Sequence, residues 1–321
     1  MKRPALAFTI FSLALTACGG GGGAGAATAV PVAVATASAT ASASYTCPTA
    51  QTSAGTLNCA ALPLGDLKYS TSGAQRGSIY LCHVPGNSSP AVSSAPWLDT
   101  SAHTWNALQK VVVQGAVSWA GSFHESVNGT NRAIASNGLP TVASTGTFPI
   151  QSSDPASQYD RNPNSIAAQT FDFSVPANPS AASSPGCLDG GPIGITVTGV
   201  AVYDAFDGAG YDGVAREEQD ACHGHPDQSS TYHYHGWLQA CVPDGGSPSQ
   251  NSSLLGYAAD GYGIYGPWYG GKMLTSSDLD ACHGTTSPVM WDGQLVTMYH
   301  YVSTYDFPYT LGCYHGIATR I

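Results

Sequence analysis

The sequence predicts a mainly β, β-sandwich-like architecture that is cross-linked by disulfides and contains an internally duplicated β unit and a few short helices. Three observations support this class. Short apolar alternations are separated by Asn-Gly, Asp-Gly and proline turns, and only 9% of the residues are charged, which disfavours long amphipathic helices. The chain contains nine cysteines. An Asp-Ala-Cys-His-Gly block at 220–224 recurs at 280–284, and a Tyr-His-Tyr block follows each copy.

A targeting segment is predicted at the beginning of the chain. Lys2 and Arg3 precede a short apolar run, as in a signal peptide, which we assign to residues 1–17. The run ends in Leu-Thr-Ala-Cys, which resembles a bacterial lipobox and predicts that Cys18 is diacylated. Residues 18–44 would then comprise the lipidated cysteine and a flexible Gly/Ala/Ser/Thr tether. We expect lipid anchoring in the bacterial cell envelope, on the periplasmic or cell-surface face; an ordinary signal peptide with an unrelated cysteine is the alternative.

The remainder of the chain is long enough for one large domain or two packed lobes. We divide it into an N-terminal β region, 45–186, and a C-terminal region, 187–321, which contains the repeat and can form one compact unit with the first. The expected elements are short helices at 102–110 and just before Cys222 and Cys282, and strands at 110–114, 193–203 and 295–301.

The cysteine pattern predicts four disulfides. With Cys18 assigned to the lipid, eight cysteines remain, and an even number is typical of disulfide bonding in an exported chain. Two pairs follow from the repeat, a third closes a local loop, and the fourth joins the two cysteines that remain. The expected pairs are Cys222–Cys241, Cys282–Cys313, Cys47–Cys59 and Cys82–Cys187. They leave no thiolate, so a metal site must use nitrogen and oxygen ligands.

Acidic residues are concentrated in the C-terminal region. Without Lys2 and Arg3, eight basic residues stand against twenty acidic ones, and fourteen acidic but only three basic residues follow residue 186. This distribution opposes binding to nucleic acid and attraction to anionic membranes, and it suits a cation.

Histidines provide the candidate site. Four of them fall within residues 223–235, and His233 and His235 would share one face of a strand because side chains two apart point the same way. If the two repeats face each other, a histidine of the second copy joins them. Neutral imidazoles suit copper or zinc, with carboxylates to orient the rings; the alternative is that the histidines are structural. The expected ligands are His225, His233, His235 and His300, and the expected orienting residues are Asp220, Asp227 and Asp260.

Five motifs follow one another in the C-terminal region: Cys-x-Gly-His-Pro, Tyr-His-Tyr-His, a long Leu-Gly-Tyr-Ala-Ala-Asp-Gly-Tyr-Gly-Ile-Tyr-Gly-Pro segment, Leu-Asp-Ala-Cys and Phe-Pro-Tyr-Thr-Leu-Gly-Cys. Their order resembles that of the bacterial YHYH-domain family, and the resemblance covers about Ile193 to Gly316. The resemblance implies an exported protein. Members of this family carry more histidines in the second copy, where this chain has Thr285 and Val302, so one site is expected here instead of two.

Enzymatic motifs are incomplete, so we expect a binding protein. His223, His225 and Asp227 have part of a hydrolase-type spacing, but Gln228 replaces its last histidine, and no Gly-x-Ser-x-Gly occurs. An extracellular hydrolase, or a wall protein that binds a cell-surface glycan, is the alternative. Its aromatic surface would comprise Trp237, Tyr257, Tyr262, Tyr265, Trp268 and Tyr269. Calcium binding by Asp204, Asp207 and Asp212 is disfavoured, because an Asp-Gly turn explains this segment more simply.

Overall fold

The computed structural model describes residues 45–321. The predicted signal peptide (1–17), the lipidated Cys18 and the tether (18–44) lie outside the described residues. Within 45–321, no helix combines the length and the apolar character needed to cross a bilayer. Strands are the main regular elements of this part of the chain, so the predicted mainly β class is confirmed.

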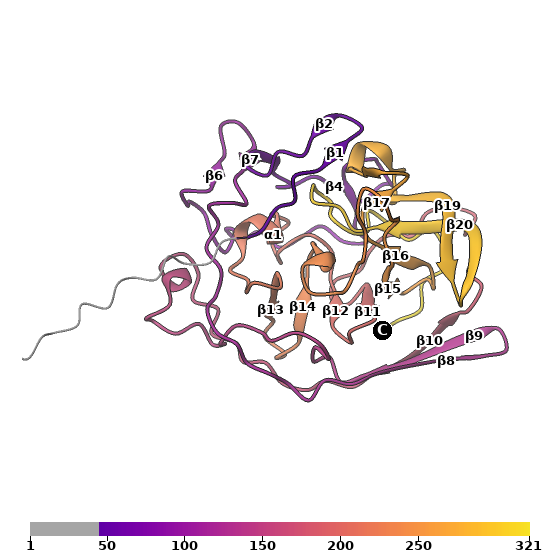
Figure 1. Ribbon diagram of the computed structural model, residues 1–321. Coiled ribbons are helices and arrows are strands. Elements are labelled where there is room, and N and C mark those ends of the chain that lie inside the picture. Colours follow the sequence, from indigo (N-terminus) through magenta and orange to yellow (C-terminus); the bar gives the residue numbers. More distant parts are fainter. Residues whose placement is uncertain (1–44) are drawn as a thin grey trace, which may run out of the picture. The chain divides into compact units, whose positions relative to one another are not determined.

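An eight-stranded mixed sheet forms the centre of the described region (Figure 1). Its strands lie in the order β13-β14-β12-β11-β15-β16-β20-β19. They are rich in Tyr, Val and Ile, whose branched or aromatic side chains favour the extended backbone. Their bounds are β11 Gly194–Thr196, β12 Ala201–Val202, β13 Gly224–Pro226, β14 Tyr232–Tyr234, β15 Leu254–Ala258, β16 Gly263–Tyr265, β19 Gly284–Trp291 and β20 Gln294–Val302.

The sheet consists of two four-stranded copies of one unit. Strands β11, β12, β13 and β14 correspond to β15, β16, β19 and β20, and the second copy has the strand order of the first in reverse. In each copy the second strand pairs in parallel with the fourth, and the third and fourth strands form an antiparallel hairpin. The copies meet where β11 and β15 pair antiparallel. The sequence repeat is therefore a structural duplication whose copies join edge to edge.

The Asp-Ala-Cys-His-Gly block forms the same turn in both copies. Its carboxylate accepts hydrogen bonds from the backbone N–H groups of the block's cysteine and glycine, at 2.9 and 3.3 Å for Asp220 and at 2.9 and 3.0 Å for Asp280. The block's histidine has a positive φ, 63° for His223 and 67° for His283. Non-glycine residues rarely adopt this conformation, so these hydrogen bonds offset its cost.

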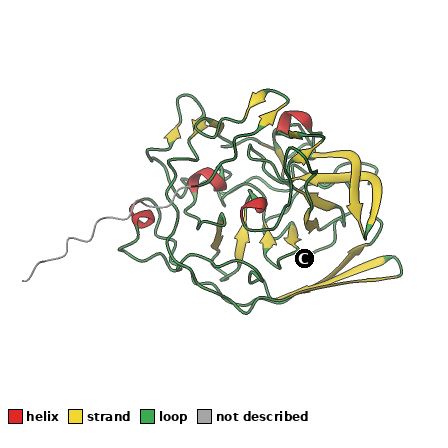
Figure 2. Ribbon diagram, viewed as in Figure 1, coloured by secondary structure: helices red, strands yellow, loops and turns green. Residues whose placement is uncertain are grey.

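Smaller sheets and long loops surround the main sheet, and helices are few (Figure 2). The smaller sheets have the orders β17-β18-β1-β2, β10-β9-β8, β3-β7-β6 and β4-β5. Their strands are β1 Gln51–Thr52, β2 Gly55–Thr56, β3 Leu62–Pro63, β4 Tyr69–Ser70, β5 Ile79–Tyr80, β6 Leu98–Asp99, β7 Thr104–Trp105, β8 Phe123–Asn128, β9 Asn131–Ser136, β10 Phe171–Pro176, β17 Trp268–Tyr269 and β18 Lys272–Met273. The helices are α1 Gly213–Arg216 and the 3-10 helices η1 Pro155–Gln158, η2 Leu238–Ala240 and η3 Ser276–Asp278.

The N-terminal region packs directly against the duplicated sheet. Leu81 and Leu188 form a parallel β-bridge, and Arg216 makes an ion pair of 2.7 Å with Asp66. One continuous cluster of buried apolar side chains draws residues from both regions, from Tyr45 to Tyr314. The loops before residue 187 thus share a core with the sheet.

Four disulfides cross-link the described residues, and all four join the cysteines that the repeat and the loop lengths predict. The bridges close segments of very different length. Their sequence separations are 12 for Cys47–Cys59, 105 for Cys82–Cys187, 19 for Cys222–Cys241 and 31 for Cys282–Cys313.

Some local predictions are wrong. Residues 102–110 are not helical, because His103 has a φ of 53° and Thr104–Trp105 forms strand β7 between two neighbours. The predicted strand at 110–114 contributes only isolated bridge residues, Val111 and Val113, of which Val113 pairs with Asp220. The short helices before Cys222 and Cys282 are present as α1 and η3, and the strands predicted at 193–203 and 295–301 are present as β11, β12 and β20.

A buried arginine ties the β8-β9-β10 sheet to the hairpin of β19 and β20. The Arg132 guanidinium donates to the Asp292 carboxylate at 2.7 and 2.8 Å and forms an ion pair with Glu125. It also lies 4.7 Å from the ring centres of Tyr257 and Trp291. This single side chain, fully buried, therefore joins two sheets through charge and packing.

Replacing Arg132 by methionine should lower the free energy of unfolding by about 3 kcal/mol, because two carboxylates lose their partner and two aromatic rings lose a cation. Urea denaturation measures the change. Arg161→Met is the matched control: Arg161 is exposed, so its replacement should change stability by less than about 0.5 kcal/mol. Equal effects of the two substitutions would contradict the assigned role.

Candidate metal centre

The hairpin of β13 and β14 brings three histidines together. His225 lies directly opposite His233 in the antiparallel pair. His235, two residues beyond His233, projects to the same side of the sheet. The three rings are only 3 to 4% exposed, and their centroids lie 4.6 to 5.3 Å apart. The predicted pair of imidazoles on one strand face thus gains a third member from the neighbouring strand.

Backbone carbonyl groups orient two of the rings. His233 Nδ1 lies 3.0 Å from the Thr231 carbonyl oxygen, and His235 Nδ1 bonds to the Asp204 carbonyl oxygen. A carbonyl oxygen only accepts, so each Nδ1 carries the hydrogen. His225 Nδ1 instead lies 3.4 Å from the amide nitrogen of Asn162. The Nε2 atoms of His233 and His235 are therefore directed into the cluster with their lone pairs available in the neutral form.

A glutamate completes the cluster. The Glu217 Oε2 atom lies 3.1 Å from His235 Nε2 and 3.5 Å from His225 Nε2, and the Nε2 atoms of His233 and His235 are 3.1 Å apart. Ligand atoms around a tetrahedral zinc ion with bonds of 2.0 to 2.1 Å are separated by about 3.3 Å. The three measured separations match this value. Potential ligand atoms of the three histidines all lie within 4.8 Å of one another.

Sequence reasoning missed Glu217. Only three glutamates occur in the chain, and Glu217 and Glu218 stand just before the histidine block. That clustering was the available signal. The side chain is placed by α1, which ends at Arg216, and by Lys110, whose buried Nζ donates to the carbonyl oxygens of Val214 and Glu217 at 2.6 Å each. A cation at the C-terminal end of a helix stabilises its unpaired carbonyl groups, so Lys110 fixes the backbone that carries Glu217.

Electrostatics distinguish the three imidazoles. Burial lowers the pKa of His225 and His233 well below the usual value, and the neighbouring imidazoles add to the effect. Burial also opposes the charged form of His235, but the Glu217 carboxylate outweighs it and raises the pKa of His235 to about 9. At neutral pH the rings of His225 and His233 are therefore neutral, as metal ligation requires. The His235 ring is protonated and pairs with the Glu217 carboxylate.

The cluster lies at the wall of an acidic cavity of about 540 Å³. Five further carboxylates line it, and no lysine or arginine is among the described lining residues. A cavity with one sign of charge raises the local concentration of ions of the opposite sign, so cations are drawn toward the histidines. The five carboxylates belong to Asp160, Asp189, Asp204, Asp207 and Asp227.

One of the three predicted orienting carboxylates is near the cluster. Asp227 accepts a hydrogen bond of 2.8 Å from Tyr203 Oη, and the Tyr203 ring stacks on the His233 ring at 3.9 Å. Asp227 thus acts on the site through Tyr203, not by accepting from an imidazole. Asp227 therefore lies near the cluster, but the expected hydrogen bond from an imidazole N–H to its carboxylate is not made.

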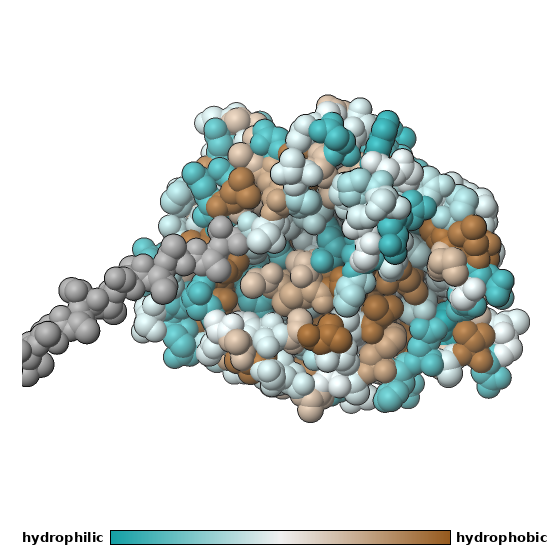
Figure 3. All heavy atoms as spheres, in the orientation of Figure 1, coloured by the Kyte–Doolittle hydropathy of each residue, from teal (hydrophilic) through white to brown (hydrophobic). Residues whose placement is uncertain are grey.

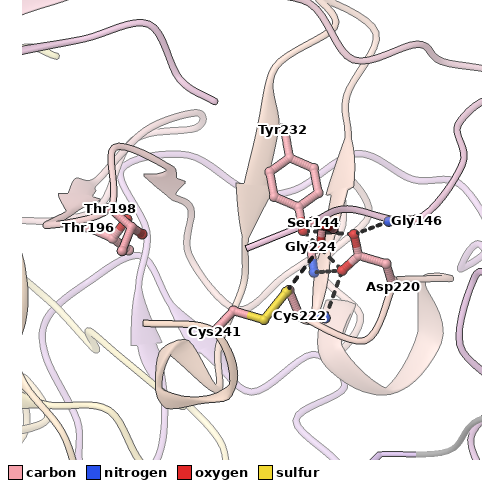
Figure 4. Close-up of a disulfide and its surroundings, with 9 residues drawn as sticks. All are labelled: Ser144, Gly146, Thr196, Thr198, Asp220, Cys222, Gly224, Tyr232 and Cys241. Atoms are coloured by element: carbon pink, nitrogen blue, oxygen red, sulfur yellow. Dashed lines mark hydrogen bonds between the residues drawn. A yellow bond between two sulfur atoms is a disulfide. The ribbon is translucent and has the colours of Figure 1, made fainter. Parts of the chain in front are cut away.

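The other two carboxylates have structural roles. Asp220 accepts from Tyr232 Oη at 2.9 Å and from the Gly146 N–H at 2.8 Å, which anchors a loop beside the Cys222–Cys241 disulfide (Figure 4). Asp260 accepts from Tyr301 Oη and the Gly316 N–H. Both contact tyrosines that alternate with histidines on a strand, so they lie on the opposite face from the imidazoles.

The prediction that His300 joins the cluster is wrong. His300 occupies in β20 the place that His233 has in β14, and four strands separate β14 from β20. Five strand spacings amount to roughly 24 Å. His300 is distant because the two copies lie edge to edge in one sheet. The histidines of both copies would converge only if the copies faced each other.

Other conspicuous residues are structural. The His223 ring packs against the rings of Tyr45 and Trp237, at 3.6 and 4.6 Å, so the structural alternative holds for this histidine. The segment of the disfavoured calcium site forms turns instead: the carboxylates of Asp204 and Asp207 accept from backbone N–H groups two or four residues ahead, as in Asp-initiated turns.

These observations define a disulfide-linked, mainly β protein with a buried histidine and glutamate cluster beside an acidic cavity, and its four disulfides indicate a location outside the cytoplasm. Residues 172–273 match the family model described as YHYH protein. This match is consistent with a YHYH-family protein, as the motif order predicts. The match begins before Ile193 and ends before the second histidine block. No curated protein and no solved structure matches the chain.

Proposed function

We propose that this protein binds one transition metal ion, copper or zinc, through His225, His233, His235 and Glu217. The observation that supports this is the spacing of the ligand atoms: three separations of 3.1 to 3.5 Å among nitrogen and oxygen atoms that share one buried point. His225 Nε2 has no hydrogen-bond partner among the described residues. Buried polar atoms are seldom left unbonded, and a metal ion would satisfy this one.

The ligand set favours copper or zinc over harder cations. Imidazole nitrogens suit zinc and copper, while calcium and magnesium prefer all-oxygen coordination. The eight cysteines of the described region are all in disulfides, so they supply no thiolate. The acidic cavity supplies a route for a cation to the cluster.

Metal analysis of protein purified without a polyhistidine tag tests the proposal. After equilibration with copper or zinc and removal of loosely bound ions, one equivalent per chain is expected by mass spectrometry of the elements. Protein that retains neither ion would overturn the assignment.

Metal affinity should rise between about pH 6 and pH 9. Burial alone would lower the pKa of His235, but Glu217 raises it to about 9, so below that pH a metal ion must displace a proton. Each pH unit below 9 should therefore weaken the apparent affinity about tenfold. Titration calorimetry in buffers of different ionisation enthalpy counts the released proton. An affinity that is constant over this range would contradict the assigned protonation.

A metal-dependent hydrolase is the second candidate, and the cavity beside the cluster favours it because a substrate would have access to the ion. A bound ion would supply Lewis acidity there, and Glu217 would accept a proton instead of acting as a ligand. Hydrolysis of ester or peptide substrates that requires both the ion and Glu217 would support this candidate. A loaded protein without such activity would leave metal binding as the function.

Anchoring is part of the proposal. Cys18 would carry the lipid that holds the domain to a membrane of the bacterial cell envelope, with residues 18–44 as the tether. Labelling of the expressed protein with a fatty acid, and its loss in Cys18→Ser, tests this. An unlabelled protein released into the medium would favour an ordinary signal peptide.

A further inference from the structure

The second copy of the duplicated unit has its own cavity, of about 640 Å³. It is the counterpart of the acidic cavity, because equivalent residues line both: Tyr203 and His233 in the first correspond to Tyr265 and His300 in the second. Asp204 of the first is replaced by Gly266. Duplication thus produced two cavities whose lining has since diverged.

The chemistry of the second cavity is neutral. None of the described residues that line it is an aspartate, glutamate, lysine or arginine, whereas six carboxylates line the first. The histidine positions that complete the first cluster are occupied here by Thr285 and Val302. A charged ligand would find no counterion in this cavity, so the lining favours an uncharged ligand.

Two aromatic residues on a short hydrogen-bonded strand line this cavity. Trp268 and Tyr269 are partly exposed and form strand β17. The backbone of Trp268 donates to Ser252 Oγ at 2.9 Å and accepts from the Ser252 N–H at 2.8 Å, and Asn251 Oδ1 accepts from the Gly270 N–H. The backbone that carries the two rings is therefore held in place before any ligand arrives, which reduces the entropy lost on binding.

A buried polar group faces the same space. His300 lines the cavity and is 3% exposed; its Nδ1 lies 3.2 Å from the Met298 carbonyl oxygen, which fixes the hydrogen on that nitrogen. Its Nε2 makes no hydrogen bond to any described residue and is left as an acceptor. Hydroxyl and amide side chains of Ser249 and Gln250 add donors and acceptors at the exposed side.

We propose that the second cavity binds a neutral pyranose unit of an extracellular polysaccharide. A pyranose presents an apolar C–H face, which packs on aromatic rings such as those of Trp268 and Tyr269, and a rim of hydroxyls, which His300 Nε2 and the amide and hydroxyl side chains bond. The exposed apolar side chains Met290 and Leu295 lie on the rim, in the region of β19 and β20 where Figure 3 shows brown surface. They extend the contact beyond one sugar unit, which favours a polymer over a free monosaccharide.

The other expected aromatic residues are not exposed on this surface. Trp237, Tyr257 and Tyr262 are at most 4% exposed and belong to the core, and Tyr265, which lines the cavity, is only 2% exposed. Trp268 and Tyr269 alone of the six expected aromatic residues remain partly accessible. This restricts the sugar site to the second cavity and separates it from the metal cluster.

The test uses the mature protein without a polyhistidine tag. Binding to cellulose, chitin and starch is measured by sedimentation with the polymer, and binding to their soluble oligosaccharides and to free glucose is measured by calorimetry. We expect a dissociation constant on the order of 1 mM or below for one oligosaccharide series, weaker binding of glucose, and no change on removal of metal.

Two substitutions locate the site. Trp268→Ala should weaken oligosaccharide binding about tenfold or more because it removes a stacking surface, and His300→Ala should weaken it by a smaller factor. Trp119→Ala, which removes a partly buried tryptophan outside the cavity, should leave it unchanged. Circular dichroism confirms that each variant is folded. Absence of binding to every neutral sugar and polymer, or binding that both cavity variants retain, would overturn the proposal.

Discussion

Replacing His233 and His235 by alanine is expected to abolish stoichiometric metal binding. The two side chains supply two of the four ligands, and their Nε2 atoms lie 3.1 Å apart. Sites with four protein ligands bind zinc with apparent free energies of about 10 to 16 kcal/mol, so the loss of two ligands should weaken binding by at least about a thousandfold. Competition with a chromogenic chelator measures the affinity.

His300→Ala is the matched control for this experiment. His300 is the equivalent of His233 in the second copy and is equally buried, at 3% exposure, but it lies on the other half of the sheet. This variant should bind the metal ion as the unchanged protein does. A large loss of metal affinity in His300→Ala would mean that the second copy contributes to the site, and would contradict the arrangement described above.

Glu217→Gln separates the carboxylate from the imidazoles. The amide keeps the shape of the side chain but not its charge, so metal affinity should fall by less than in the double histidine variant. A metal ion at about one hundred times its dissociation constant should stabilise the unchanged protein by about 2.7 kcal/mol, and this stabilisation should shrink in the same order across the variants. Thermal denaturation with and without the ion provides this second measurement.

Removing the Cys82–Cys187 bridge should produce the largest loss of stability among the four disulfides. It closes a segment of 105 residues, and in the chain-entropy account a loop of this size contributes about 4.7 kcal/mol by restricting the unfolded state. The bridge also joins the N-terminal region to the beginning of the duplicated sheet. The double variant Cys82→Ser, Cys187→Ser should therefore unfold at a clearly lower urea concentration.

The variant Cys47→Ser, Cys59→Ser is the comparison, because its bridge spans only 12 residues and the same account gives it about 3 kcal/mol. Urea denaturation under non-reducing conditions yields both values. A loss that is equal for the two double variants would show that loop length does not govern these disulfides.

The local features of the site were predictable because they depend on short stretches of chain. A Tyr-His-Tyr-His segment alternates its side chains in any strand, so the pairing of His233 with His235 follows from sequence alone. The cysteine pairs within each repeat follow from its duplication. The helix expected at 102–110 failed because Trp105 gains more from pairing within a three-stranded sheet than from helical periodicity.

Sequence by itself determined the mainly β class, the four disulfide pairs, the duplication and the resemblance to the YHYH family, because each follows from composition, spacing or motif order. Tertiary structure alone decided that Glu217 joins the histidines and that Asp220 and Asp260 accept hydrogen bonds from tyrosines. It also decided that His300 lines a second, separate cavity. The sequence repeat shows that two similar units exist, but it does not show whether these units pack face to face or edge to edge. That choice depends on how β11 and β15 pair across some sixty residues of chain, and it sets which side chains converge.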